Sequence, residues 1–143
     1  MSADPVALAR IARDPVTVDE CEHAVDSPAH GAVVTFAGVV RDHDEGRGVL
    51  RLSYEAHPEA PAALLASARR IAERFPEVRV AAVHRVGDLV VGDLALACAV
   101  ASAHRAAAFE ACAALVDDIK ATVPIWKEQS FVDGSSEWVA SLG

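Results

Sequence analysis

Residues 78–103, VRVAAVHRVGDLVVGDLALACAVASA, contain two apolar runs separated by a short polar link. The runs at 78–86 and 94–103 are short and bounded by glycine and aspartate, which is typical of strands. Residues 88–93 predict a small hairpin element between them. Parallel neighbours need a long crossover connection, so links this short favour largely antiparallel pairing. The sequence therefore predicts a mixed α+β fold with largely antiparallel pairing.

Two further strands are expected upstream. Residues 31–41, GAVVTFAGVVR, form a nearly continuous valine-rich run, which predicts a strand buried on both faces. Residues 42–48, DHDEGRG, predict a polar loop, and residues 49–57 predict a second strand. We expect these two strands to pair as neighbours.

Two long helices and one short helix complete the expected elements. Apolar residues recur at helical spacing in residues 61–75 and 105–122. Thr17 and Glu20 have the spacing of a capping box, which predicts a short N-terminal helix of about two turns. Strands are expected around 125–132 and 137–141. Without internal repeats or linkers, residues 1–143 are expected to form a single domain.

Composition excludes several classes of function. The 13 Lys and Arg residues against 21 Asp and Glu residues give a net charge of −8, which argues against nucleic-acid binding. No run approaches the roughly 18 apolar residues of a membrane span, and the N-terminus lacks a secretory signal pattern, so we expect a soluble, cytoplasmic protein without membrane association. The histidines and the three cysteines lack the spacing of a metal site, so we expect no bound metal. We expect the cysteines to be reduced thiols with a structural role.

The basic residues are unequally divided. Eleven are arginines, and the two lysines, Lys120 and Lys127, flank Pro124-Ile125-Trp126. Lysine can release its proton in a protein whereas arginine cannot, so a retained lysine indicates proton transfer or amine chemistry. From this count alone, chance is an equally good explanation.

The helix expected at 105–122 carries two cations on its apolar stripe. The stripe consists of Ala108, Phe109, Cys112, Leu115, Val116 and Ile119, and both Arg105 and Lys120 fall on it. Either their stems cover the core while their charges reach water, or the two cations face a cavity. A rise of 1.5 Å per residue separates them by about 22 Å, so they serve different sites, or two chains contribute to one site.

Several segments together resemble the large, catalytic subunit family of molybdopterin synthase. The resemblance extends from about Gly31 to Trp138, some three quarters of the chain. In chain order the segments that carry it are residues 31–41, Tyr54-Glu55, residues 84–87, residues 102–105 with Phe109-Glu110, Lys120, and residues 124–127. Each segment alone is a weak signal, but their order along the chain is specific.

The resemblance implies a fold, an activity and partners. Members have an α/β hammerhead fold and convert cyclic pyranopterin monophosphate into molybdopterin by adding two sulfurs. The sulfur arrives as a C-terminal thiocarboxylate on a small ubiquitin-like subunit. The large subunits form a homodimer within a heterotetramer, and no cofactor is needed. A non-catalytic homodimer that only docks the ubiquitin-like carrier is the alternative.

The family motifs also imply a site. Carried over by position, they give a substrate-binding set of Val39, Val40, Arg41, His104, Arg105, Lys120, Lys127, Glu128 and Gln129. Lys120 and Lys127 are the implied catalytic residues, with Lys120 assigned to proton transfer and Lys127 to charge stabilisation, or the reverse. In the family picture, the His-Arg pair reaches the pocket from the neighbouring large subunit.

Two positions differ from the family pattern. A second basic residue and then a glutamate commonly follow the second lysine, whereas Glu128 and Gln129 follow Lys127 here. Val116 stands where many members have methionine. Trp126 and Trp138 are expected to serve in packing or at an interface rather than to stack on a pterin.

Overall fold

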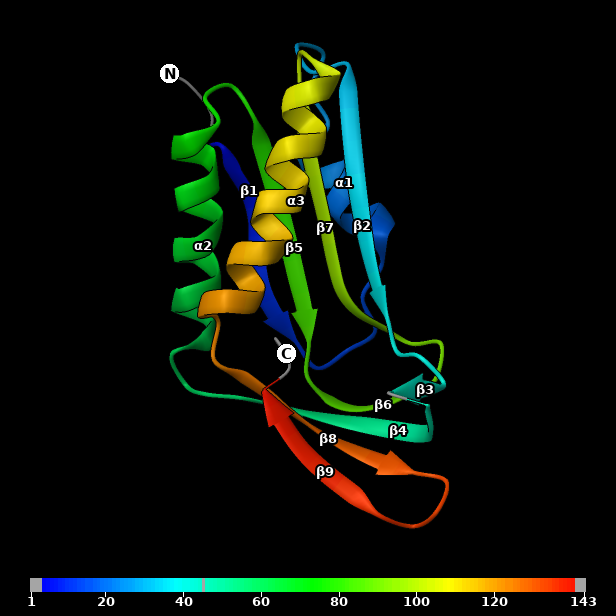
Figure 1. Ribbon diagram of the computed structural model, residues 1–143. Coiled ribbons are helices and arrows are strands. Elements are labelled where there is room, and N and C mark those ends of the chain that lie inside the picture. Colours follow the sequence, from blue (N-terminus) through cyan, green and yellow to red (C-terminus); the bar gives the residue numbers. More distant parts are fainter. Residues whose placement is uncertain (1–3, 45, 141–143) are drawn as a thin grey trace.

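The computed structural model describes residues 4–44 and 46–140 and shows two sheets with three helices around the first (Figure 1). The first sheet has four strands in the order β1 (Val6–Ala12), β5 (Arg79–Arg85), β7 (Leu94–Ser102) and β2 (Ala32–Val39). β1 pairs with β5 in parallel, and the other neighbours are antiparallel. The predicted α+β class with largely antiparallel pairing is confirmed.

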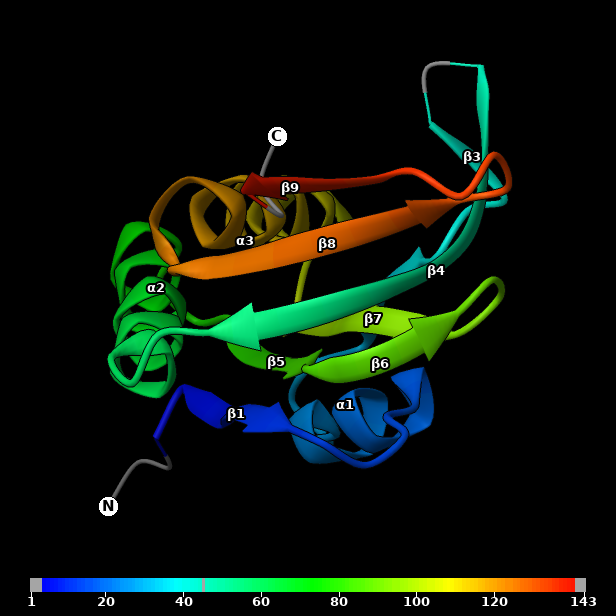
Figure 2. The same cartoon turned by 90° about the horizontal axis from the view of Figure 1, so that it is seen from below.

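The second sheet is organised around the long strand β4 (Arg47–Ala56). Its partners are β3 (His43–Asp44), β6 (Gly87–Val90) and β8 (Ile125–Phe131), and β9 (Ser136–Ala140) pairs with the free side of β8. Figure 2 shows β6, β4, β8 and β9 side by side. All of these pairs are antiparallel.

Helices cover both faces of the first sheet. The long helices α2 (Ala60–Arg74) and α3 (Arg105–Thr122) lie on one face, and the short helix α1 (Val18–Val25) lies on the other (Figure 1). The central strands β5 and β7 are therefore buried on both sides; on β5, Val80 packs toward the long helices and Ala81 toward α1. This double burial explains the continuous apolar runs of residues 78–103.

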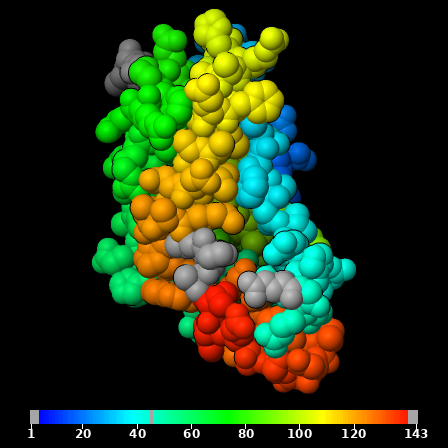
Figure 3. All heavy atoms as spheres, viewed as in Figure 1, coloured from blue at the N-terminus to red at the C-terminus, as the bar shows by residue number. Residues whose placement is uncertain are grey.

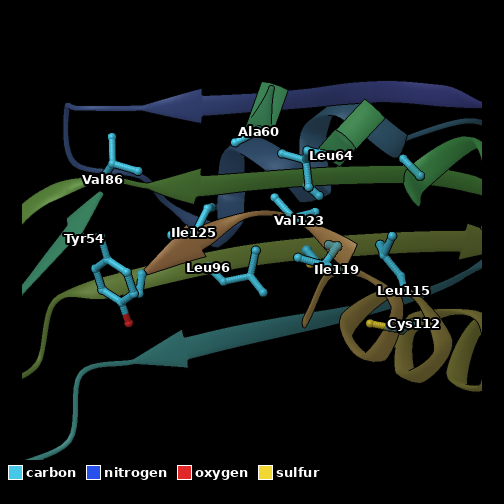
Figure 4. Packing of buried hydrophobic residues seen from close by; sticks show 14 of the residues in the cluster. Tyr54, Ala60, Leu64, Val86, Leu96, Cys112, Leu115, Ile119, Val123 and Ile125 are labelled. Carbon is cyan, nitrogen blue, oxygen red and sulfur yellow. The ribbon is translucent and has the colours of Figure 1, made fainter. Parts of the chain in front are cut away.

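The main core connects the long helices to both sheets (Figure 4). It includes Leu64 of α2, Leu96 of β7, Leu115 and Ile119 of α3, Tyr54 of β4 and Ile125 of β8. The C-terminal end of α3 is consequently anchored where the two sheets meet. A fully buried Leu or Ile contributes on the order of 2 kcal/mol to folding, so this junction is well held.

The expectations for residues 31–57 need two corrections. β2 pairs with β7 and not with β4. It is also not buried on both faces, because its residues alternate between partly buried and exposed and Val39 is 48% exposed. β2 forms an edge of the first sheet, and valine content alone does not show whether a second face is covered.

The remaining differences are local. β1 was not expected, and the predicted hairpin element at 88–93 is the strand β6, which pairs with β4 before a turn at Gly92. The predicted loop 42–48 includes β3. Phe109, predicted to lie on the buried stripe of α3, is 62% exposed, and Ala111 is buried instead.

All three helices were predicted correctly. α3 spans the predicted residues, α2 begins one residue before the prediction, and α1 has the predicted cap, with the Glu20 N–H donating to Thr17 Oγ1 at 3.1 Å. Within the described residues, no helix is long and apolar enough to cross a bilayer.

Replacing the cap of α1 provides a test of its contribution to folding. We expect Thr17→Ala to lower the free energy of unfolding by about 1 kcal/mol, because the Glu20 N–H loses its acceptor. Thr17→Ser keeps the hydroxyl and should remain within a few tenths of a kcal/mol of the original protein. Urea denaturation followed by circular dichroism measures both; equal stability of the two variants would contradict the predicted role.

Candidate functional site

A pocket of about 360 Å³ opens where the end of α3 meets both sheets. Its walls come from the C-terminal end of β2, from β3 and β4, and from the facing residues of β8. Lys120, Lys127 and Arg41 line it together with Val39, Val40 and Gln129. The volume lies within the range typical of small-molecule sites.

The connection between α3 and β8 brings the two lysines to this pocket. Val123 and Ile125, which flank Pro124, are both buried. The Val123 N–H donates to the Ile119 carbonyl at 3.0 Å, and the Pro124 carbonyl accepts from the His57 N–H at 3.0 Å. With the connection fixed in this way, Lys120 in the last turn of α3 and Lys127 near the start of β8 reach the same cavity.

The two lysines differ in environment. Lys127 is half-buried, and burial is the main cause that lowers the pKa of its ammonium group. Asp44 and Glu137 act in the opposite direction, whereas Lys120 and Arg41 lower that pKa further. The Lys120 side chain is exposed at the pocket.

A neutral histidine forms part of the pocket wall. Burial lowers the pKa of His84 to about 4, while its Nδ1–H donates to the Arg85 carbonyl at 2.8 Å. Its ring packs edge-to-face on Tyr54, with centroids 5.2 Å apart. Burial also raises the pKa of Tyr54 to about 12. Near neutral pH both groups are therefore uncharged.

One carboxylate faces the cations. Asp44 accepts a hydrogen bond from Gln129 Nε2 at 2.8 Å, and its other oxygen lies 3.6 Å from Arg41 Nη2. Gln129 is only 3% exposed. Three further residues line the pocket that neither residue counts nor family motifs predicted as site residues: Asp44, His84 and Tyr54. Leu52 and Tyr54 are two residues apart on β4 and therefore lie on the same face of the strand. This spacing is the sequence signal that could have indicated the pocket wall formed by β4.

Three residues of the predicted substrate-binding set lie outside the pocket. His104 and Arg105 are exposed at the N-terminal end of α3, about 22 Å along the helix from Lys120. Figure 3 shows this yellow end of α3 at the opposite end of the molecule from the red strand β9. Glu128 points away from the pocket, on the face of the sheet that its β4 partner Ser53 shares.

The cysteines and tryptophans lie outside the pocket. Cys21, Cys98 and Cys112 are free and buried, which confirms the predicted core positions of Cys98 and Cys112. Burial raises the pKa of each thiol. Trp126 and Trp138 are exposed on β8 and β9, and neither lines the cavity.

A model of the family described as MoaE protein matches residues 11–122. This chain belongs to the MoaE family. The molybdopterin synthase catalytic subunit 1 of Mycobacterium tuberculosis is 41% identical over 131 residues, which are 91% of this chain and 88% of that protein. The catalytic subunit of Halalkalibacterium halodurans is 40% identical over 90% of this chain and 83% of its own.

Solved structures agree with the MoaE assignment. The crystal structure of molybdopterin synthase from Staphylococcus aureus matches with a TM-score of 0.86 and 34% identity, covering 92% of this chain and 96% of that one. A complex of subunits 1 and 2 of molybdopterin-converting factor from Helicobacter pylori matches with a TM-score of 0.70 at 19% identity, covering 92% and 88% of the two chains. The second likeness concerns the fold alone.

The burial of His84 predicts a pH dependence of stability. Its pKa is lowered in the folded chain, so the unfolded chain binds more protons and stability falls as the pH drops from about 6.5 towards 4. Between pH 7 and pH 5 this group should account for about 2 kcal/mol of lost stability. We expect His84→Gln, which does not titrate, to show a correspondingly flatter pH dependence in urea denaturation. Parallel pH curves for the two proteins would contradict the prediction.

Proposed function

We propose that this protein is a catalytic subunit of molybdopterin synthase that adds two sulfurs to cyclic pyranopterin monophosphate. The observation that carries the proposal is the meeting of both lysines of the chain with Arg41 in one pocket, in a member of the MoaE family. Relatives at about 40% identity have the name of this enzyme subunit. The sulfur donor is a small ubiquitin-like subunit with a C-terminal thiocarboxylate.

The cations suit this chemistry. The substrate phosphate and the donor thiocarboxylate are both anionic, and Arg41 can bind phosphate through charge-assisted hydrogen bonds. Sulfur transfer moves protons and leaves negative charge on oxygen and sulfur. The lysine with the lowered pKa is the better proton donor, which supports Lys127 in proton transfer and the exposed Lys120 in charge stabilisation. This is the reverse of the first assignment made from the sequence.

We also propose that a second copy of the chain completes the site. Arg105 and His104 are too far from Lys120 of the same chain to share a small substrate, but a dimer with antiparallel α3 helices would bring them to the partner's pocket. Phe109, exposed on the same end of α3, offers apolar surface for such a contact. Each end of the homodimer would then hold one small subunit, in a cytoplasmic heterotetramer.

Turnover by lysine variants tests the function. Purified protein, thiocarboxylated small subunit and cyclic pyranopterin monophosphate are mixed, and dithiolene formation is assayed. We expect Lys120→Ala and Lys127→Ala to fold and to lose at least about 100-fold in rate, because each removes a cation from the reacting centre.

Small-subunit binding separates this function from the docking-module alternative. Both lysine variants should still bind the carrier in size-exclusion chromatography if only the chemistry is lost. Absence of dithiolene formation by the original protein, with carrier binding intact, would favour the non-catalytic module.

Mixed dimers test the shared site. In the proposed arrangement, Arg105→Ala and Lys120→Ala chains are each inactive alone, but a mixed dimer contains one intact site. Co-expression with two different affinity tags allows the mixed dimer to be isolated, and the purified mixed dimer should have about half of the original activity, since one of its two sites is intact. Failure to recover activity in the purified mixed dimer would place Arg105 outside the partner's pocket.

A further inference from the structure

Asp44 occupies an unusual place in the pocket. Among the residues that the structure describes, it is the one acidic side chain that lines a cavity bearing Arg41, Lys120 and Lys127. The proposed substrates are anions, so a carboxylate here opposes their binding. We therefore expect Asp44 to act on the cationic side chains of the pocket, and its contacts indicate how it does so.

The carboxylate has two partners, one in the link between β2 and β3 and one on β8. Gln129 of β8 donates from Nε2 to Oδ2 at 2.8 Å, and the other oxygen, Oδ1, lies 3.6 Å from Arg41 Nη2. Because Gln129 is buried, its amide has little access to water and depends on this bond. The bond also ties the β3 strand to β8, the strand that carries Lys127.

Among the charged groups near Lys127, Asp44 is the carboxylate that lines the pocket. Lys120 and Arg41 oppose the ammonium charge, whereas Asp44 and Glu137 favour it. Glu137 lies outside the pocket lining and has its own cation, Arg47, at 3.4 Å. Asp44 is thus the carboxylate inside the cavity that offsets three neighbouring positive charges.

We propose that Asp44, oriented by Gln129, is a positioning residue that keeps Lys127 protonated and directs Arg41 toward the substrate phosphate. The substrate identity rests on the proposed function, but the action of the pair on Lys127 does not. Gln129 serves here as the neutral donor, because a carboxylate at that position would repel Asp44 across 2.8 Å.

A lysine titration tests the pair without any substrate. The chain has two lysines, so their ¹³Cε signals in NMR are two, and Lys120→Arg assigns them. Asp44→Asn keeps an oxygen for Gln129 Nε2 but removes the charge, and the pKa of Lys127 should fall. The double variant Asp44→Asn with Gln129→Glu returns a carboxylate to the other end of the same hydrogen bond, and the pKa should recover.

Asp42→Asn is the matched control. It removes one negative charge two residues away, but Asp42 is exposed, bonds to His43 and does not line the pocket. Its Lys127 titration should equal that of the original protein. An unchanged Lys127 pKa in Asp44→Asn, or an equal fall in Asp42→Asn, would overturn the proposal. If Asp44→Asn does not fold, Asp44→Ser supports the same comparison.

Kinetics provide the second measurement. The rate of dithiolene formation by Asp44→Asn should fall about tenfold, which is the scale of one charge-assisted contact. The alkaline limb of its pH–rate profile should move to lower pH, because Lys127 loses its proton at a lower pH. The double variant should regain most of the rate. A fully active original protein with an Asp44→Asn variant of unchanged rate and pH profile would refute the role of Asp44. An original protein inactive toward the pterin would instead refute the proposed function, and the titration would still decide the role of Asp44.

Discussion

The site depends on the buried connection between α3 and β8. Val123 and Ile125 are packed into the core on either side of Pro124, and backbone hydrogen bonds hold Val123 and Pro124. The chain therefore leaves the helix and enters the strand in one fixed geometry. Two lysines seven residues apart would be independent in a mobile loop, but here each begins from a rigid element and both end in the same cavity.

The register of β4 against β8 determines which side chains join them. Tyr54 lies opposite Lys127 and Leu52 opposite Gln129, so these four residues share the pocket face. Alternation in a strand then directs Glu128 to the other face. A slip of one residue would turn Glu128 inward and both Lys127 and Gln129 outward, replacing a cation with an anion. The packing of Leu52 and Tyr54 in the core opposes such a slip.

Local sequence signals predicted the helices well and the strand partners poorly. The cap at Thr17 and the apolar spacing in residues 105–122 each depend only on residues of one helix, so they can be recognised without knowledge of the rest of the fold. The partner of β2 is a long-range property: its valines fit a central strand as well as the edge that it forms. Phe109 was misplaced for a similar reason, because helical spacing defines a stripe but not which end of it remains uncovered.

The site was predictable to the extent that residue type implies chemistry. The rarity of lysine pointed to Lys120 and Lys127, and the family resemblance added Arg41, all of which the pocket brings together. Asp44 gave no such signal, since it lies in an acidic, polar stretch typical of a solvated loop, and only its contact with Gln129 on a distant strand distinguishes it.

The charge of the pocket differs in sign from that of the chain as a whole. A protein of net charge −8 repels anions over most of its surface, and this long-range repulsion is screened beyond roughly 8–10 Å in physiological salt. At the half-buried Lys127 the nearby charges matter more, because interactions between close charges strengthen as water is excluded. An arginine in place of Lys127 would supply the same charge but would retain its proton. Lysine at this position permits both attraction of an anion and release of a proton, provided that a carboxylate such as Asp44 limits the effect of burial.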